Sequence, residues 1–195
     1  MKRISRHGNK KLINKIKNMP NWCHNSLDIT GEEKDIISFL KKFTTKNEEG
    51  KDRSLDLEKI IKTPKELLTG EGWYDWRHKN WGTKWNIIPN DSMEREPGSV
   101  IFVFDSAWAP CDEAIKKLSK KCPELTMNLE YCEPGIMFAG RAEYKGGETI
   151  SEYKTENPAD QIFKDFGYGD LMEQEDEVTV TEPKHCPNCL HNLKD

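Results

Sequence analysis

The chain has 195 residues, of which 35% are hydrophobic and 33% are charged, and its formal net charge is −4. This length suits one domain with appendages, and the negative net charge gives no overall attraction for long nucleic acid. No apolar run could span a membrane, and residues 1–18 lack the apolar core of a secretory signal. We therefore expect a soluble cytoplasmic protein without membrane contact or lasting disulfides.

The chain begins with a basic segment, residues 1–18, which contains seven Lys and Arg residues. Leu12, Ile13 and Ile16 could line one face of a short helix within it. The segment is either an extension ahead of the folded domain or a basic arm that contacts a phosphate backbone or a partner. The sequence leaves both possibilities open.

A strand and a helix are the first elements that the pattern predicts. Residues Trp22–Thr30 alternate, with Leu27 and Ile29 at the apolar end of one side, as in a half-buried strand. Residues Glu32–Phe43 carry apolar side chains at helical spacing. The polar stretch that follows is irregular, apart from a weak helix expected after Pro64 and a strand that could begin at residues 84–86.

A second group of elements follows a turn-rich loop. Val100–Phe104 is a short apolar run typical of a central strand. Pro110 favours the start of a helix over residues 111–121, and the next stretch, 126–132, alternates again. Two further strands, 137–144 and 149–153, flank Gly146 and Gly147, which indicates a hairpin.

This order predicts an α+β protein with a ferredoxin-like (split βαβ) antiparallel sheet, two helices on one face and a C-terminal hairpin. The buried helix residues are expected to include Ile36, Leu40, Ile115 and Leu118. We divide the chain into a basic N-terminal extension, a ferredoxin-like domain with an inserted Trp-rich segment, and an acidic linker with a Cys/His tail. The expected ranges are 1–18, 19–155 with the insertion at about 44–86, and 156–195.

Four of the six tryptophans lie close together, at positions 73, 76, 81 and 85. They are either a small structural core, in which Asp75 and Arg77 pair locally, or a pocket. In a pocket, aromatic planes would stack on a flat ligand such as a nucleobase, while Arg77 and Lys84 would meet phosphate. A structural core would leave both cations in solvent, whereas a pocket would make them converge near Asn80.

Distinctive motifs span roughly residues 19–145 and include Met19 to Asn25, Asn80 to Trp85 and Tyr131 to Gly140. These motifs resemble the YubB-type, or Api-ninety-two-like, family of phages and plasmids. The resemblance implies a ferredoxin-like fold without an iron–sulfur cluster, and it places residues 1–18 outside the family's usual start. This chain departs mildly from the family at Ala109 and Cys111. The resemblance implies no established activity.

The resemblance also implies one shared polar and aromatic surface. Together with the Trp-rich segment, it gives the expected ligand-binding residues. These are Asn21, Asn25, Asp75, Trp76, Arg77, Asn80, Trp81, Lys84, Trp108 and Glu133.

The C-terminal tail holds a C-x-x-C turn, Cys186 to Cys189, flanked by His185 and His191. Two thiolates at this spacing chelate zinc well, so these four residues are the expected metal ligands. One zinc ion would not easily take all four without strain, so a second chain or one of several residues elsewhere could complete the site, namely Cys23, His24, Cys111, Cys122 or Cys132. A free-thiol tail is the alternative. The other four cysteines, at positions 23, 111, 122 and 132, are expected to be small buried hydrophobic residues.

Three function classes remain open. The first is a small binding module for a nucleotide or another planar anionic ligand. The second is a host-interaction or counter-defence protein that acts through protein contacts. The third is a metal-dependent hydrolase or nuclease that uses Asp75, His78 and Glu133, although no sequence motif of a known catalytic site occurs. The sequence favours the two binding classes over an enzyme without deciding between them, and the expected partner is a small anionic ligand or a host protein.

Overall fold

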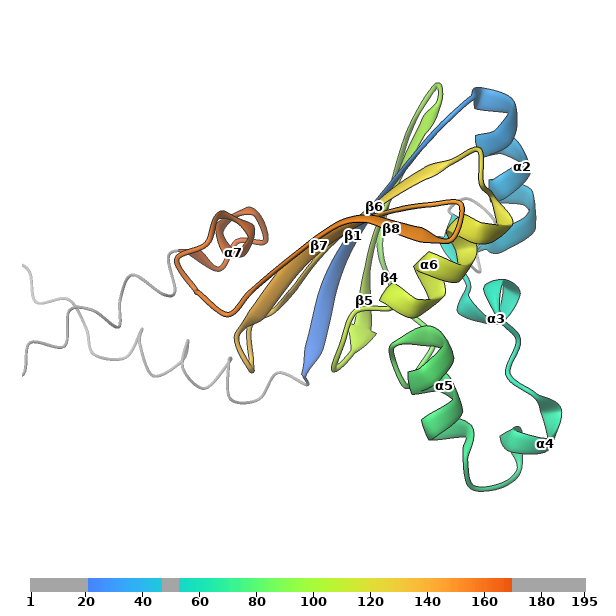
Figure 1. The fold of residues 1–195 in the computed structure, drawn as a ribbon, viewed down its shortest axis with the longest axis horizontal. Coiled ribbons are helices and arrows are strands. Elements are labelled where there is room, and N and C mark those ends of the chain that lie inside the picture. The colour runs from blue at the N-terminus through green and yellow to red at the C-terminus, as the bar shows by residue number, and fades with distance from the viewer. Residues whose placement is uncertain (1–20, 47–52, 170–195) are drawn as a thin grey trace, which may run out of the picture.

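A six-stranded antiparallel sheet organises the chain in the computed structural model, which describes residues 21–46 and 53–169 (Figure 1). The order of the strands across the sheet is β4-β5-β1-β6-β7-β8. Their bounds are β1 Trp22–Thr30, β4 Ile88–Glu96, β5 Ser99–Ala107, β6 Thr126–Glu133, β7 Phe138–Lys145 and β8 Glu148–Thr155.

Four of these strands and two helices make the ferredoxin-like core. The chain runs from the central strand β1 through α2 (Glu33–Phe43) to the edge strand β4, and returns in β5 beside β1. It then passes through α6 (Asp112–Lys121) to β6, on the other side of β1. This is the split βαβ arrangement, with β7 and β8 added as a hairpin. The predicted fold class is confirmed.

Both long helices cover the same face of the sheet (Figure 1). The apolar side chains Ile36 and Leu40 of α2 and Ile115 and Leu118 of α6 are each at most 3% exposed. They share one core with the inward side chains of β1, whose buried residues alternate along the whole strand. The burial predicted from helical and strand periodicity is confirmed.

A long insertion separates α2 from β4. It contains the small hairpin of β2 (Thr44–Lys46) and β3 (Arg53–Leu55), then the short helices α3 (Leu57–Ile60) and α4 (Lys65–Leu68), and then α5 (Trp73–Trp81). The sequence pattern does not predict α5, because its aromatic residues do not follow one face. Two glycines with left-handed backbone, Gly72 (φ 105°) and Gly82 (φ 84°), bound it. The carbonyl oxygen of Pro110 would lie 2.7 Å from a Cβ at Gly82, so this glycine also permits close approach.

The hairpin of β7 and β8 turns at Gly146 and Gly147, whose φ angles are 60° and 90°. Two positive φ angles in a two-residue turn match the right-handed twist of a hairpin, which confirms the predicted one.

Helix α7 (Gln161–Asp165) then packs on the sheet face opposite α2 and α6, with Ile162 and Phe163 buried against Cys132 and Ala139. The expectation of a linker from residue 156 is therefore wrong for the first part of this segment, because α7 and the residues after it pack on the sheet.

Within the two described ranges, no helix is long and apolar enough to cross a membrane.

Candidate functional site

The Trp-rich segment builds a closed cluster around Arg77. The indole of Trp81 is fully buried, and its Nε1 donates to the carbonyl of Ile61 at 2.9 Å. The Arg77 guanidinium lies over the Trp81 ring, 4.5 Å from its centroid. It donates to the Glu58 carboxylate at 3.0 Å and to the Thr63 hydroxyl at 3.2 Å. Arg77 and Trp81 thus hold the insertion together.

Glu58, not Asp75, is the ion-pair partner of Arg77 in this closed cluster. The Arg77 side chain is 17% exposed, and Asp75 lies exposed on the first turn of α5. The structural interpretation of Trp81 and Arg77 therefore fits their contacts, although the local pair with Asp75 does not form. The expectation that a structural core would leave Arg77 in solvent is wrong, because Glu58 and Thr63 hold its guanidinium. Trp76 is half-buried, with its ring 6.2 Å from that of Trp81.

Asn80 ties α5 to α6. Its amide donates to the Trp76 carbonyl at 2.8 Å, while Lys117 of α6 donates to the backbone and side-chain oxygens of Asn80 at 3.1 Å each. A lysine at the C-terminal end of a helix satisfies carbonyls that have no partner within the helix. Burial lowers the pKa of Lys117. Asn80 is occupied by these contacts and is not free for a ligand.

Asn25 is buried within β1, and Glu133 is buried at the end of β6. The Asn25 amide donates to the Cys23 carbonyl at 2.7 Å and to the Ser106 hydroxyl at 2.8 Å, and its oxygen has no hydrogen-bond partner among the described residues. Glu133 is 1% exposed and accepts from the backbone N–H groups of Gly135 and Ile136 at 3.1 and 2.6 Å. Both side chains are occupied in shaping β1 and the turn after β6.

A second group of aromatic side chains is open to solvent. The Lys84 ammonium lies 4.0 Å from the centroid of the Trp85 ring and 5.5 Å from that of Trp108. The ring of Trp22 lies 5.9 Å from that of Trp85. Trp85 and Trp108 are 43% and 49% exposed. We call Trp22, Lys84, Trp85 and Trp108 the aromatic–lysine patch.

Trp108 has an unusual backbone for a tryptophan, because its φ is +70°. A non-glycine residue in this left-handed region costs roughly 1–3 kcal/mol and persists only where surrounding contacts fix it. Here the Trp108 N–H donates to the carbonyl of Asn21 at 2.9 Å, which joins the end of β5 to the start of β1. A strained residue that presents a half-exposed ring is a candidate for function.

Thr83 connects the closed cluster to the patch, and the sequence analysis did not single it out. Its hydroxyl is buried, donates to the Ala107 carbonyl at 2.9 Å and accepts from the Ala107 N–H at 3.0 Å. The Arg77 guanidinium also reaches the Lys84 carbonyl at 3.5 Å. These contacts fix residues 83–85 beside residues 107–108. A threonine directly before the Lys-Trp pair was the only sequence signal.

A groove of about 590 Å³ begins just after Trp108. This volume lies in the range of small-molecule sites. Burial raises the pKa of Asp112 and of Tyr131, so both groups bind their protons more tightly than in water. The groove is lined by Ala109, Pro110, Asp112, Tyr131, Phe138, Ala139, Lys154, Thr155 and Glu156.

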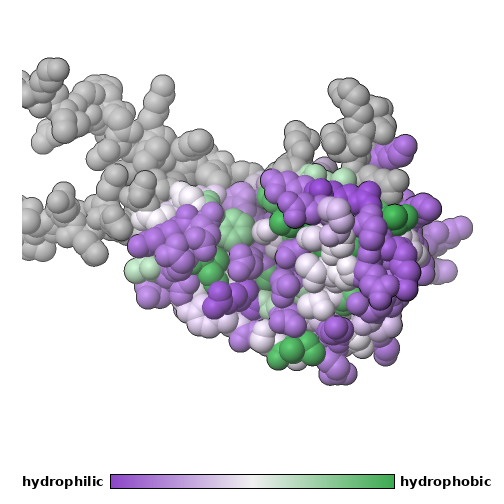
Figure 2. Space-filling model, turned by 90° about the horizontal axis from the view of Figure 1, so that it is seen from above, coloured by the Kyte–Doolittle hydropathy of each residue, from purple (hydrophilic) through white to green (hydrophobic). Residues whose placement is uncertain are grey.

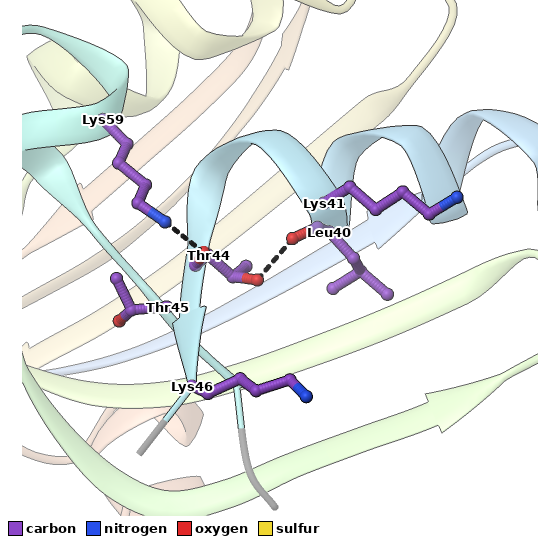
Figure 3. Close-up of a pocket in the computed structure, with 6 residues that line it drawn as sticks. All are labelled: Leu40, Lys41, Thr44, Thr45, Lys46 and Lys59. Carbon is purple, nitrogen blue, oxygen red and sulfur yellow. Dashed lines mark hydrogen bonds between the residues drawn. The ribbon is translucent and has the colours of Figure 1, made fainter. Parts of the chain in front are cut away.

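A smaller pocket of about 330 Å³ lies at the end of α2 and carries three lysines, but these do not converge (Figure 3). Lys59 donates to the Thr44 carbonyl at 2.7 Å, so its ammonium already has a backbone partner. Figure 3 shows Lys41 and Lys46 directed away from Lys59. The pocket therefore offers no focused anion site.

The molecular surface seen from above is mainly hydrophilic, with separate apolar residues and no broad apolar area (Figure 2).

The four cysteines within the described residues are buried free thiols, as predicted. Burial raises the pKa of Cys122 to about 11 and of Cys132 to about 12, and it also raises the pKa of Cys23 and Cys111. In the same part of the chain, no group of three or more His, Cys, Asp or Glu side chains could hold a metal ion. The predicted ligands His185, Cys186, Cys189 and His191 lie outside the described residues.

The polar groups considered for catalysis are not joined. No hydrogen bond or ion pair links Asp75, His78 and Glu133 in the described chain, and the Nε2 of His78 is buried without a partner there. A different chain of contacts does form. His24 Nδ1 lies 2.6 Å from the Asp105 carboxylate, and the Tyr168 hydroxyl lies 2.8 Å from His24 Nε2. Burial raises the pKa of Tyr168 to about 12, so this phenol stays protonated and anchors the end of the described chain.

Comparison with protein families agrees with the fold and with the resemblance. No curated protein matches the chain. The crystal structure of protein Api92 from Yersinia pseudotuberculosis is similar, with a TM-score of 0.48 and 14% sequence identity over 70% of this chain and 98% of that one. The model of the family described as "Ferredoxin-like domain in Api92-like protein" matches residues 80–183, more than half of the sequence. The chain therefore belongs to the Api92-like family.

Proposed function

We propose that this protein is a small binding module whose aromatic–lysine patch binds a planar anionic ligand, with a nucleotide as the first candidate. The observation that carries the proposal is the setting of Lys84. Its ammonium lies beside two indole rings that are both more than two-fifths exposed. Arg77, by contrast, has its donors directed to interior partners.

The chemistry of the patch suits a flat ligand with a negative group. An exposed indole face can stack on a base, which is worth about 1–3 kcal/mol per base. A lysine ammonium can bind a phosphate or carboxylate, and a hydrogen bond to a charged group contributes roughly 1.5–3 kcal/mol. The contacts of Thr83 and Asn21 hold both sides of the patch in place before binding, which lowers the entropy cost of association.

Size and charge favour a small ligand over a long nucleic acid. The patch carries one lysine, and the whole chain has a formal net charge of −4. Binding to a phosphate backbone relies on several cations that each neutralise a phosphate. The groove whose lining starts at Ala109, the residue after Trp108, offers room for the remainder of a small ligand.

Calorimetry with nucleoside monophosphates, the matching nucleosides and inorganic phosphate tests the proposal. Binding should require both the base and the phosphate. Lys84→Ala should weaken binding about tenfold or more, and Trp108→Ala should do the same. Lys65→Ala removes an exposed lysine on α4 and is the matched control. Equal binding by wild type and Lys84→Ala, or no binding to any nucleotide or other planar anion, contradicts the proposal.

A second candidate is contact with a host protein, in keeping with the phage and plasmid setting that the resemblance implies. Ile88, at the start of β4 and three residues after Trp85, is 45% exposed and is a second exposed apolar side chain in this part of the chain. Exposed aromatic residues are common anchors in protein interfaces. A defined partner whose binding is lost in Trp85→Ala and Ile88→Asp but kept in Lys84→Gln would favour this function over ligand binding.

The predicted zinc site in the tail stays a prediction with its own test. If Cys186 and Cys189 bind zinc, with His185 or His191 among the further ligands, elemental analysis of unchelated protein should give close to one zinc per chain or per dimer. The double change Cys186→Ser and Cys189→Ser should release the metal, whereas Cys122→Ser should not.

A further inference from the structure

The sheet face opposite α2 and α6 is lined by acidic side chains. Asp28 of β1 is paired across the strands with Asn128 of β6, and Asn128 with Glu143 of β7. One row further along, Ser26 is paired with Glu130 of β6. Helix α7 is the one described helix on this side, and it packs at the Cys132 end (Figure 1). We call Asp28, Glu130 and Glu143, with the apolar Ile101 and Val103 of β5, the acidic face.

The three carboxylates have no ion-pair partner among the described residues, although Asp28 accepts from the Ser99 hydroxyl at 3.2 Å. Arg141 pairs with Glu130 across the strands, but its guanidinium lies over the Tyr153 ring at 5.5 Å. Asn128 lies between Asp28 and Glu143 in one row of the ladder, and Arg141 is the residue opposite Glu130. Three carboxylates around this arginine make the face complementary to a basic segment.

Nucleic acid is a poor occupant of this face. Ferredoxin-like sheets that bind RNA present aromatic rings to the bases, whereas the central positions here are Ser26, Asp28 and Val103. Three carboxylates would also repel a phosphate backbone.

We propose that residues 1–18 of the same chain dock on the acidic face. This segment has seven Lys and Arg residues and contains no Asp or Glu. It is connected almost directly to β1, the central strand that carries Asp28. Leu12, Ile13 and Ile16 provide apolar side chains for Ile101 and Val103, so both the charge and the apolar character of the segment fit the face.

The length of the segment allows this placement. Eighteen extended residues span at most roughly 60 Å. Strand β1 has nine residues and is about 30 Å long. The segment can therefore turn back and cover the whole face, and the covalent connection keeps its effective concentration near the millimolar range.

Limited trypsin digestion of the full chain tests the proposal. Cleavage after Lys10, Lys11, Lys15 and Lys17, followed by mass spectrometry, is compared with cleavage of a free peptide of residues 1–20. Docking should slow cleavage in the protein about tenfold. This is the combined effect expected from three surface ion pairs of ordinary strength. Raising the salt to about 1 M shortens the Debye length to about 3 Å and should remove most of this protection.

Two matched triple variants identify the surface. Asp28→Asn with Glu130→Gln and Glu143→Gln removes three charges and keeps the shapes, so cleavage should become as fast as in the peptide. Glu66→Gln with Glu71→Gln and Glu124→Gln removes three exposed charges elsewhere and should leave protection unchanged. Circular dichroism confirms that both variants are folded.

Three results overturn the proposal. The first is cleavage of the wild-type segment as fast as that of the free peptide. The second is equal protection in the two triple variants. The third is protection that increases with protein concentration, which would mean that the face is covered by another copy of the chain.

Discussion

Two clusters in this protein combine tryptophan with a cation, and they differ in what surrounds the cation. In the closed cluster, Arg77 is 17% exposed and contacts Glu58, Thr63 and the Trp81 ring. In the aromatic–lysine patch, Lys84 contacts two rings that are themselves 43% and 49% exposed, and no carboxylate pairs with it within the described residues.

The difference shows how a binding cation can be told from a structural one. Both cations lie on aromatic rings, so ring contact alone does not separate them. The two cations differ in how many hydrogen-bond acceptors in the protein interior they contact and in how exposed the neighbouring rings are. A guanidinium whose donors are satisfied inside the protein has little left to offer a ligand, whereas an ammonium on open rings retains its donors.

The largest expected effect is on Arg77. Arg77→Ala removes the cation that pairs with Glu58 and donates to Thr63 in a half-buried site, and it leaves the Glu58 carboxylate with hydrogen bonds from Thr63 alone. The free energy of unfolding should therefore fall by roughly 2–3 kcal/mol. Arg77→Lys keeps the charge but loses the planar fork and should recover only part of the loss. Urea denaturation measures both. A loss within about 0.5 kcal/mol for Arg77→Ala would make the closed cluster an exposed site instead.

Thr83 should give the next largest effect, because it joins the two clusters. Thr83→Val removes the hydroxyl that contacts both the N–H and the carbonyl of Ala107, which costs about 1–3 kcal/mol for buried groups left without partners. Thr83→Ser keeps the hydroxyl and is the matched control. Ligand affinity of the patch should fall in Thr83→Val as well. If the two variants are equally stable, the hydroxyl does not position the patch.

A smaller difference in stability is expected between two substitutions at Trp108. Both Trp108→Ala and Trp108→Gly remove the half-exposed ring, but only glycine relieves the left-handed backbone. The glycine variant should therefore be more stable than the alanine variant by about 1 kcal/mol, as judged by thermal unfolding. The reverse order would show that the backbone at this position is not strained.

The smallest effect concerns Lys84 itself. Lys84→Gln should change the free energy of unfolding by less than about 0.5 kcal/mol. Iodide, an anion, should quench the fluorescence of the patch tryptophans less in this variant than in wild type, because the attracting charge is gone. Neutral acrylamide should quench both proteins equally. An unchanged iodide response would show that the ammonium does not create a local positive site.

Elements with a clear local pattern could be predicted from the sequence, and contacts between distant segments could not. The alternation in β1, the apolar faces of α2 and α6 and the glycine pair at 146–147 each specify their structure within a few residues. The partner of Arg77 lies 19 residues earlier in another helix, so no local pattern indicates it. Trp22 and Trp85 are far apart in the sequence, and only the folded sheet brings their rings together. Of the four patch residues, the sequence analysis therefore predicted Lys84 and Trp108 as ligand-binding residues but not Trp22 or Trp85.

Helix α7 was missed for a different reason, since its signal was present but short. Asp160 accepts a hydrogen bond from the Ile162 N–H at 3.1 Å, which is a regular N-cap. The helix has five residues, and Ile162 and Phe163 are its buried members. An Asp followed by two adjacent apolar residues in an otherwise polar stretch is too little to distinguish a short packed helix from a linker.

The buried thiols can report how often different parts of the protein open. Alkylating reagents react with the thiolate, and burial both shields these cysteines and keeps them protonated. The alkylation rate of each cysteine therefore measures how often the structure around that thiol opens. Cys132 lies beneath α7, whereas Cys23 lies in the main core. Peptide mapping of the two labels would therefore time the release of α7 separately from the opening of the sheet.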